Sequence, residues 1–150
     1  MRRIMLSAFL LLQKEQAAVT TPQNAVEAFF AAHTQGKIDE MQATYAPAAT
    51  VTFMQTGGTG TAQVSTTLNV KQYLGWYQGQ FASRASMRFV VGQTSVNMQG
   101  SLAAVWVPLE VHETMKDGRQ VTFRIAASLQ MFRENGVWKI TAHAWQAVAN

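Results

Sequence analysis

The sequence of 150 residues contains no cysteine. This absence excludes disulfide bonds, thiolate nucleophiles and metal sites built on cysteine. Charged residues are also scarce, at 13% of the chain with a formal net charge of +4. After residue 18 the Lys and Arg residues stand singly, whereas a surface that binds a phosphate backbone needs them clustered. We therefore expect no nucleic acid among the partners.

No apolar run in the sequence is long enough to cross a membrane. The longest follows Arg2-Arg3 and extends from Ile4 to Leu12, whereas a membrane-spanning helix needs about 20 apolar residues. We therefore expect no stable membrane insertion. A basic start before a short apolar run is typical of a secretory signal peptide, but Gln16 stands where cleavage after Ala18 would favour a small residue.

Two interpretations of residues 1–18 stay open. As a signal peptide, the segment would be removed and the protein would be periplasmic or secreted. As an N-terminal helix, it would pack on the domain or on a partner, and the protein would be cytoplasmic. In both cases residues 19–150 are predicted to form a single domain, because the chain is 48% hydrophobic and long enough to bury its own core.

Three helices are predicted early in the domain. The first begins at Pro22, behind the N-cap candidate Thr21, and ends at Gly36. A second, short helix begins near Asp39. Apolar residues at helical spacing around Tyr73 predict the third.

The rest of the domain is predicted to be β-sheet and loops. Residues 50–54 are β-branched and aromatic and predict a strand, whereas the Gly- and Thr-rich residues 57–67 predict a mobile loop. From Met87 onward the pattern is β, with strands at 87–91, 102–113, 121–133 and 137–145. Turns are predicted at 134–136 and at Asp117-Gly118, a preferred pair for a two-residue hairpin.

A two-residue turn at Asp117-Gly118 sets the register of the long hairpin. Ser128 then lies opposite Val107 and Gln130 opposite Val105, so these residues share one face with Arg124 and Phe132. The other face carries Trp106, Pro108, Glu110 and His112 together with Phe123, Ile125, Ala127 and Leu129. Because both faces are substantially apolar and helices can cover only one, we expect a homodimer through the second, outer face.

The order of these elements resembles nuclear transport factor 2-like (NTF2-like) domains. The resemblance extends over most of residues 22–148 and depends on Gly36, on Tyr45-Ala46-Pro47-Ala48-Ala49-Thr50-Val51 and on the ending Trp138-Lys139-Ile140…His143…Trp145. It implies an α+β cone with three N-terminal helices packed on a strongly curved, mostly antiparallel sheet and a pocket between them. The superfamily includes ketosteroid isomerases, scytalone dehydratase, SnoaL-type cyclases, limonene epoxide hydrolase and non-catalytic association domains, so the fold does not select a function.

The resemblance also tests one activity directly. It places the catalytic tyrosine, the aspartate base and the second acid of ketosteroid isomerases at Phe29, Phe53 and Gln130. Phenylalanine can neither take nor give a proton, and dienolate chemistry needs a base within reach of the acidic carbon. We therefore reject ketosteroid isomerisation.

His143 is the best catalytic candidate. SnoaL-type enzymes resemble this chain in having a histidine close to this place, and a histidine of near-neutral pKa can act as a base or donate a hydrogen bond. The alternative is a core histidine satisfied by Ser128, Gln130 or a backbone carbonyl. The residues predicted to contact a ligand are Phe29, Tyr45, Phe53, Trp76, Tyr77, Arg124, Ser128, Gln130, Phe132 and Trp145.

The ligand prediction follows from these side chains. They are mostly apolar, and Arg124 at the pocket mouth can bind a carboxylate, so a small apolar or carboxylated organic molecule is expected. No cofactor motif is present, and no metal is expected because Glu110 and His112 give two ligands where zinc needs three or four.

The sequence thus predicts a small-molecule-binding domain with a mostly apolar pocket and no assigned reaction. Two alternatives stay open. One is a SnoaL-type or dehydratase-like enzyme with His143 as base and Gln130 as hydrogen-bond donor. The other is a non-catalytic dimerisation or association module whose pocket is filled by its own side chains.

Overall fold

The computed structural model describes residues 21–56 and 62–148. The two interpretations of residues 1–18 concern a segment outside these ranges. Within them the elements follow in the order α2 (Pro22–Gln35), α3 (Ile38–Thr44), β1 (Tyr45–Thr56), β2 (Ala62–Asn69), α4 (Val70–Ala82), β3 (Arg84–Val91), β4 (Ser95–Gln99), β5 (Leu102–Met115), β6 (Gln120–Glu134) and β7 (Val137–Ala147).

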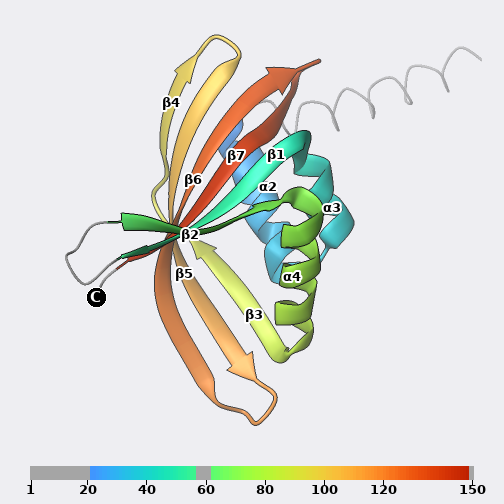
Figure 1. Cartoon of the computed structure of the whole chain (residues 1–150), viewed down its shortest axis with the longest axis vertical. Coiled ribbons are helices and arrows are strands. Elements are labelled where there is room, and N and C mark those ends of the chain that lie inside the picture. Colours follow the sequence, from blue (N-terminus) through green and yellow to red (C-terminus); the bar gives the residue numbers. More distant parts are fainter. Residues whose placement is uncertain (1–20, 57–61, 149–150) are drawn as a thin grey trace, which may run out of the picture.

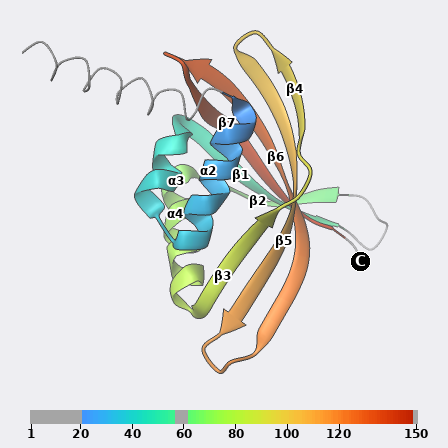
Figure 2. The same cartoon turned by 180° about the vertical axis from the view of Figure 1, so that it is seen from behind.

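A seven-stranded sheet curves around the three helices, which lie together on one side of it (Figures 1 and 2). Its strand order is β2-β1-β7-β6-β5-β3, and β4 also pairs with β5. β1 and β7 run parallel, and the other pairs are antiparallel. This architecture confirms the predicted α+β cone with a strongly curved, mostly antiparallel sheet.

The helix ends follow the predicted local signals. The Thr21 side chain accepts a hydrogen bond from the backbone N–H of Asn24 at 3.1 Å and caps α2. Gly36 ends α2 with φ at +65°, a left-handed conformation that glycine adopts without strain. α4 begins with a capping box, in which Asn69 and Gln72 each accept a hydrogen bond from the other's backbone N–H.

The register predicted for the β5–β6 hairpin was wrong by one residue. Met115 N–H donates to Arg119 O at 2.8 Å, and Gly118 has φ at +86°. The loop therefore has three residues rather than two. Three-residue hairpin loops with a left-handed glycine are common. Ser128 consequently pairs with Trp106 and Gln130 with Ala104.

The shift exchanges the two faces of β6, because neighbouring side chains in a strand point in opposite directions. Val107 now lies opposite Ala127, and Val111 lies opposite Phe123. The predicted turn before β7 is confirmed, since Glu134 pairs with Val137 across two residues of positive φ.

Two strands were missed. β2 begins within the segment 57–67 that was predicted to be a loop, so that prediction was wrong for residues 62–67. Its Thr and Val residues favour extended backbone, and pairing with β1 uses that preference. β4 consists of exposed residues and pairs with the first half of β5, while β3 pairs with the second half.

Candidate functional site

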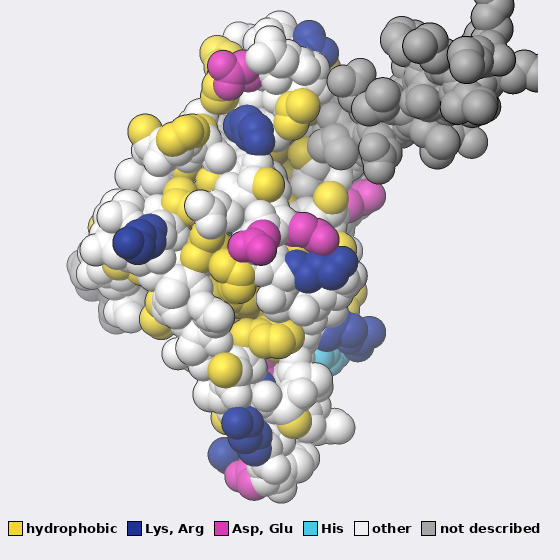
Figure 3. All heavy atoms as spheres, turned by 90° about the vertical axis from the view of Figure 1, so that its right-hand side faces the viewer, with side chains coloured by type: hydrophobic (Ala, Val, Ile, Leu, Met, Phe, Trp, Pro, Cys, Tyr) yellow, Lys and Arg dark blue, Asp and Glu magenta, His cyan; other side chains and the backbone are white. Residues whose placement is uncertain are grey.

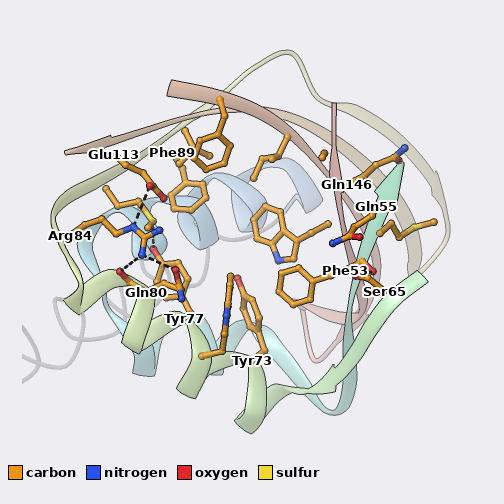
Figure 4. Close-up of a pocket in the computed structure, with 18 residues that line it drawn as sticks. Phe53, Gln55, Ser65, Tyr73, Tyr77, Gln80, Arg84, Phe89, Glu113 and Gln146 are labelled. Carbon is orange, nitrogen blue, oxygen red and sulfur yellow. Dashed lines mark hydrogen bonds and ion pairs between the residues drawn. The ribbon is translucent and has the colours of Figure 1, made fainter. Parts of the chain in front are cut away.

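A cavity of about 340 Å³ lies between α4 and the inner face of the sheet (Figure 4). Its wall is mostly aromatic and combines side chains from α4 and from strands β1, β3, β6 and β7. These side chains are Phe53, Tyr73, Trp76, Tyr77, Phe89, Phe123 and Trp145. Trp76 and Phe123 are 45% and 38% exposed, so solvent reaches this wall.

One end of the cavity carries an ion pair. Arg84 Nε, at the start of β3, lies 3.2 Å from Glu113 Oε2, near the end of β5, and both side chains are largely buried. Arg84 Nη1 also donates to the backbone oxygen of Gln80 at 3.1 Å, to Gln80 Oε1 at 2.7 Å and to Ser83 Oγ at 2.6 Å. Figure 4 shows Arg84, Glu113 and Gln80 converging at this end. A buried charge is tolerated when it is paired and hydrogen-bonded in this way.

The opposite end carries uncharged polar groups. Gln55 and Ser65 reach it from β1 and β2, and Gln146 reaches it from β7 (Figure 4). Ser65 Oγ donates to the backbone oxygen of Phe53 at 2.9 Å. The cavity therefore has an aromatic middle, a charged end and an amide-rich end.

His33 lies behind the aromatic wall and is hydrogen-bonded to two of its residues, Tyr73 and Tyr77. Its Nδ1 lies 2.9 Å from the backbone oxygen of Phe29, so this nitrogen carries the proton, and its Nε2 accepts from Tyr73 Oη at 2.9 Å. Tyr77 Oη donates to the backbone oxygen of His33 at 2.6 Å. Burial lowers the pKa of His33 to about 4, and the hydrogen bond to Phe29 offsets part of that effect. The ring is thus a neutral structural group.

His143 also lies behind the wall and does not line the cavity. Its Nδ1 is 2.7 Å from Tyr45 Oη, a partner that the sequence did not suggest. The side chain is 1% exposed and its ring centroid lies 4.4 Å from that of Trp145. Burial, with a smaller contribution from His33, moves the pKa of His143 well below 6.5. A general base must reach the proton that it removes, and this position does not give His143 that reach.

Four of the predicted ligand contacts line the cavity, namely Phe53, Trp76, Tyr77 and Trp145. Their contact with a ligand stays a prediction. Phe29 is fully buried against His33 and His143. Tyr45 and Phe132 border a different hollow, formed with the start of β1 and with Lys139.

The remaining predicted contacts point away from the cavity. They were expected on the face of the sheet that lines the pocket, and that expectation was wrong. Ser128 and Gln130 border shallow depressions on the outer face of the sheet. The Arg124 side chain is 70% exposed there and lies 3.9 Å from Glu110, whose other oxygen is 2.7 Å from His112. The one-residue register shift explains all of these misplacements together.

Sequence reasoning missed the charged end of the cavity. Glu113 continues the alternation of Val107, Leu109 and Val111 on the inner face of β5. An acid in an otherwise apolar alternation is a signal of a buried, paired carboxylate. Arg84 has no comparable local signal, because only the pairing of β3 with β5 brings it to Glu113.

The described residues offer neither a metal site nor a membrane-spanning helix. Across residues 21–56 and 62–148, no three His, Cys, Asp or Glu side chains come together in a way that could hold a metal ion. Over the same part of the chain, none of the helices is long and apolar enough to cross a membrane. Figure 3 shows the helix side of the molecule, where Lys and Arg side chains stand in separate spots around central hydrophobic ones.

The domain has the NTF2-like fold. The chain matches the family model of the SnoaL-like domain over residues 23–145, and it belongs to this family. A comparison with curated proteins finds no match.

Solved structures share the fold at low identity. A Novosphingobium aromaticivorans protein named as an aromatic ring hydroxylase has a TM-score of 0.68 and 19% identity, covering 91% of each chain. A Streptomyces avermitilis protein named as a dehydratase of the NTF2-like family has 0.65 and 18%, covering 84% of this chain and 92% of that one. A Xanthomonas campestris protein named as a calcium/calmodulin-dependent protein kinase II association domain has 0.63 and 14%, covering 83% and 84%. These likenesses show the fold alone.

Proposed function

We propose that this SnoaL-like domain binds a small, mostly apolar aromatic molecule in the cavity beneath α4. The observation that supports this most directly is the cavity of about 340 Å³ with its aromatic wall. Ligand sites in proteins are typically concave, largely apolar and upward of about 300 Å³, with few polar groups that orient the ligand. The charged end and the amide-rich end supply such groups here.

The space itself weighs against a pure association module. A module whose pocket is filled by its own side chains would leave no cavity of this size next to Tyr73 and Trp145. Enzymes and binding proteins share this fold, and no reaction is assigned to the domain. Catalysis by His143 is not part of the proposal, because aromatic side chains surround the ring and it does not line the cavity.

Thermal unfolding with a panel of small aromatic and aliphatic molecules tests the proposal. A ligand that binds only the folded state raises the free energy of unfolding by mass action, by about 2.7 kcal/mol at a ligand concentration of about 100 times Kd. The melting temperature rises accordingly. We expect aromatic members to raise it and Trp76→Ala to reduce the effect. Val137→Ala is the control, because Val137 is also partly exposed (40%) and does not line the cavity. A flat response across the panel would contradict the proposal.

We also propose that two copies of the chain associate through the outer face of the sheet. Trp106 and Leu102 are 44% and 64% exposed there, beside the small side chains of Ala104 and Ser128. An apolar sheet face of this kind is normally covered. Light scattering coupled to size-exclusion chromatography should give twice the chain mass, and Trp106→Glu should give the single-chain mass. A wild-type monomer at micromolar concentration would refute this.

A further inference from the structure

The charged end of the cavity presents an unused carboxylate oxygen. Glu113 has Arg84 as its one ion-pair or hydrogen-bond partner among the described residues, and Arg84 Nε lies 3.2 Å from Oε2. The side chain lines the cavity, and Glu113 is 8% exposed. A carboxylate accepts hydrogen bonds and donates none. A ligand that reaches this end therefore meets an acceptor that needs a donor.

The neighbouring groups strengthen this preference. Arg84 Nη1 donates to three oxygens at the end of α4, and Nε lies 3.2 Å from Glu113 Oε2 as an ion pair without a hydrogen bond. Tyr77 gives its proton to the backbone oxygen of His33. Gln80 binds Arg84 through Oε1, which leaves its NH2 group as a donor on the cavity wall.

The local charge works against an anionic ligand. The Arg84 charge is already balanced by Glu113 at 3.2 Å, and the backbone oxygen of Gln80 at the end of α4 adds partial negative charge. A ligand carboxylate would lie beside the Glu113 carboxylate in a largely buried site, where like charges repel strongly. A hydroxyl group fits better, because it can donate to Glu113 and accept from Gln80 at once.

We propose that the ligand is a neutral aromatic molecule with a hydroxyl group, bound with that hydroxyl against Glu113 and its ring between Tyr73, Phe89 and Trp145. This inference rests on the proposed binding function and narrows it to one ligand class. It replaces the carboxylated ligand that Arg124 had suggested, since Arg124 is exposed on the outer face.

Three probes of one shape test the ligand class by isothermal titration calorimetry at pH 7. These are 4-propylphenol, its methyl ether 4-propylanisole, and 4-propylbenzoate. We expect the phenol to bind at least tenfold more tightly than the ether, which corresponds to about 1.4 kcal/mol. We expect the benzoate to bind most weakly. An ether that equals the phenol, or a benzoate that matches it, would overturn the inference.

Substitution of Glu113 tests whether this side chain accepts the hydrogen bond from the hydroxyl group of the ligand. In Glu113→Gln the phenol should keep less than a threefold advantage over the ether, and the benzoate should become the tightest binder, because the charge of Arg84 is no longer balanced. Glu110→Gln is the matched control, since Glu110 lies on the same strand and on the opposite face. It should keep the wild-type order.

The outcomes separate this inference from the function on which it rests. If none of the three probes binds, the proposed binding function fails and this inference fails with it. If the ether or the benzoate binds best to the wild-type chain, the binding function stands and only the ligand class is wrong. Should Glu113→Gln not fold, the order of the three probes on the wild-type chain still decides the ligand class.

Discussion

The buried ring of His33 should make the stability of this domain fall in mild acid. The side chain is 0% exposed and packs edge-on against Phe29 and Tyr77, with centroid distances of 4.4 and 4.8 Å. Its two nitrogens already bond to the backbone oxygen of Phe29 and to Tyr73 Oη. A proton added to Nε2 would remove the acceptor that Tyr73 uses and place a charge in an apolar surrounding.

The size of the effect follows from the pKa difference between the two states. The pKa of His33 is 6.5 when unfolded and about 4 when folded, and each unit corresponds to about 1.36 kcal/mol. Because the folded pKa is the lower one, the unfolded state binds the proton first as the pH falls. The stabilisation is complete above pH 6.5 and is lost between pH 6.5 and 4, by about 3 kcal/mol in all.

Urea unfolding at pH 7.0 and pH 4.5, followed by the fluorescence of the buried Trp138 and Trp145, measures this loss. With a denaturant slope of about 1–3 kcal/mol per molar, the wild-type midpoint should fall by about 1 M or more. His33→Gln should lose about 2 kcal/mol less than the wild type over the same interval.

The comparison within each variant removes the general effect of acid. Groups that do not interact with His33 titrate in the same way in the wild type and in His33→Gln, so their contributions cancel. His143 adds to the difference in the same direction, because His33 lowers its pKa. If His33→Gln loses as much stability as the wild type between the two pH values, the imidazole is not held neutral by burial and the reasoning fails.

Two further substitutions test the packing behind the cavity. Tyr45→Phe removes the hydroxyl that lies 2.7 Å from His143 Nδ1 and should lower the free energy of unfolding by about 1–3 kcal/mol; because Tyr45 does not line the cavity, any ligand-induced rise in melting temperature should persist, and loss of that rise would show that the two regions are coupled. Gly36→Ala should destabilise by about 1–3 kcal/mol, because φ is +65° and a Cβ would lie 2.5 Å from the Phe81 ring. Gly75→Ala, with no atom within 4 Å of the added Cβ, should be neutral or stabilising by up to about 1 kcal/mol, and equal destabilisation by both would contradict the strain argument.

The sequence was informative wherever a local rule decided the structure. Pro22 and Gly36 bound the first helix, and the turn predicted at 134–136 forms on the pair Asn135-Gly136, because capping and turn geometry depend on a few adjacent residues. The Asp117-Gly118 pair is compatible with two loop lengths, and the structure uses the longer one. This difference of one residue in loop length is the reason why Ser128 and Gln130 were predicted on the wrong face of the sheet.

The cavity itself could be predicted only in part. Phe53 and Trp145 line the cavity, and their contact with a ligand stays a prediction. Arg84 was not predicted there, because its role depends on a contact between β3 and β5 that no local pattern contains. The pairing of strands distant in sequence, which creates this buried ion pair, depends on the whole sheet. Alternation along one strand can therefore indicate that Glu113 is buried, but it cannot identify Arg84 as its partner.

The buried polar groups show where chemistry can occur in this domain. Apart from the tyrosines and tryptophans, the buried polar or charged residues within the described ranges are His33, His143 and Glu113. Burial lowers the pKa of both histidines, so they stay neutral near pH 7. Glu113 alone has an oppositely charged partner, Arg84, and it alone faces the cavity. His143 does not line the cavity, so Glu113, paired with Arg84, is the one of these three groups within reach of a ligand placed there.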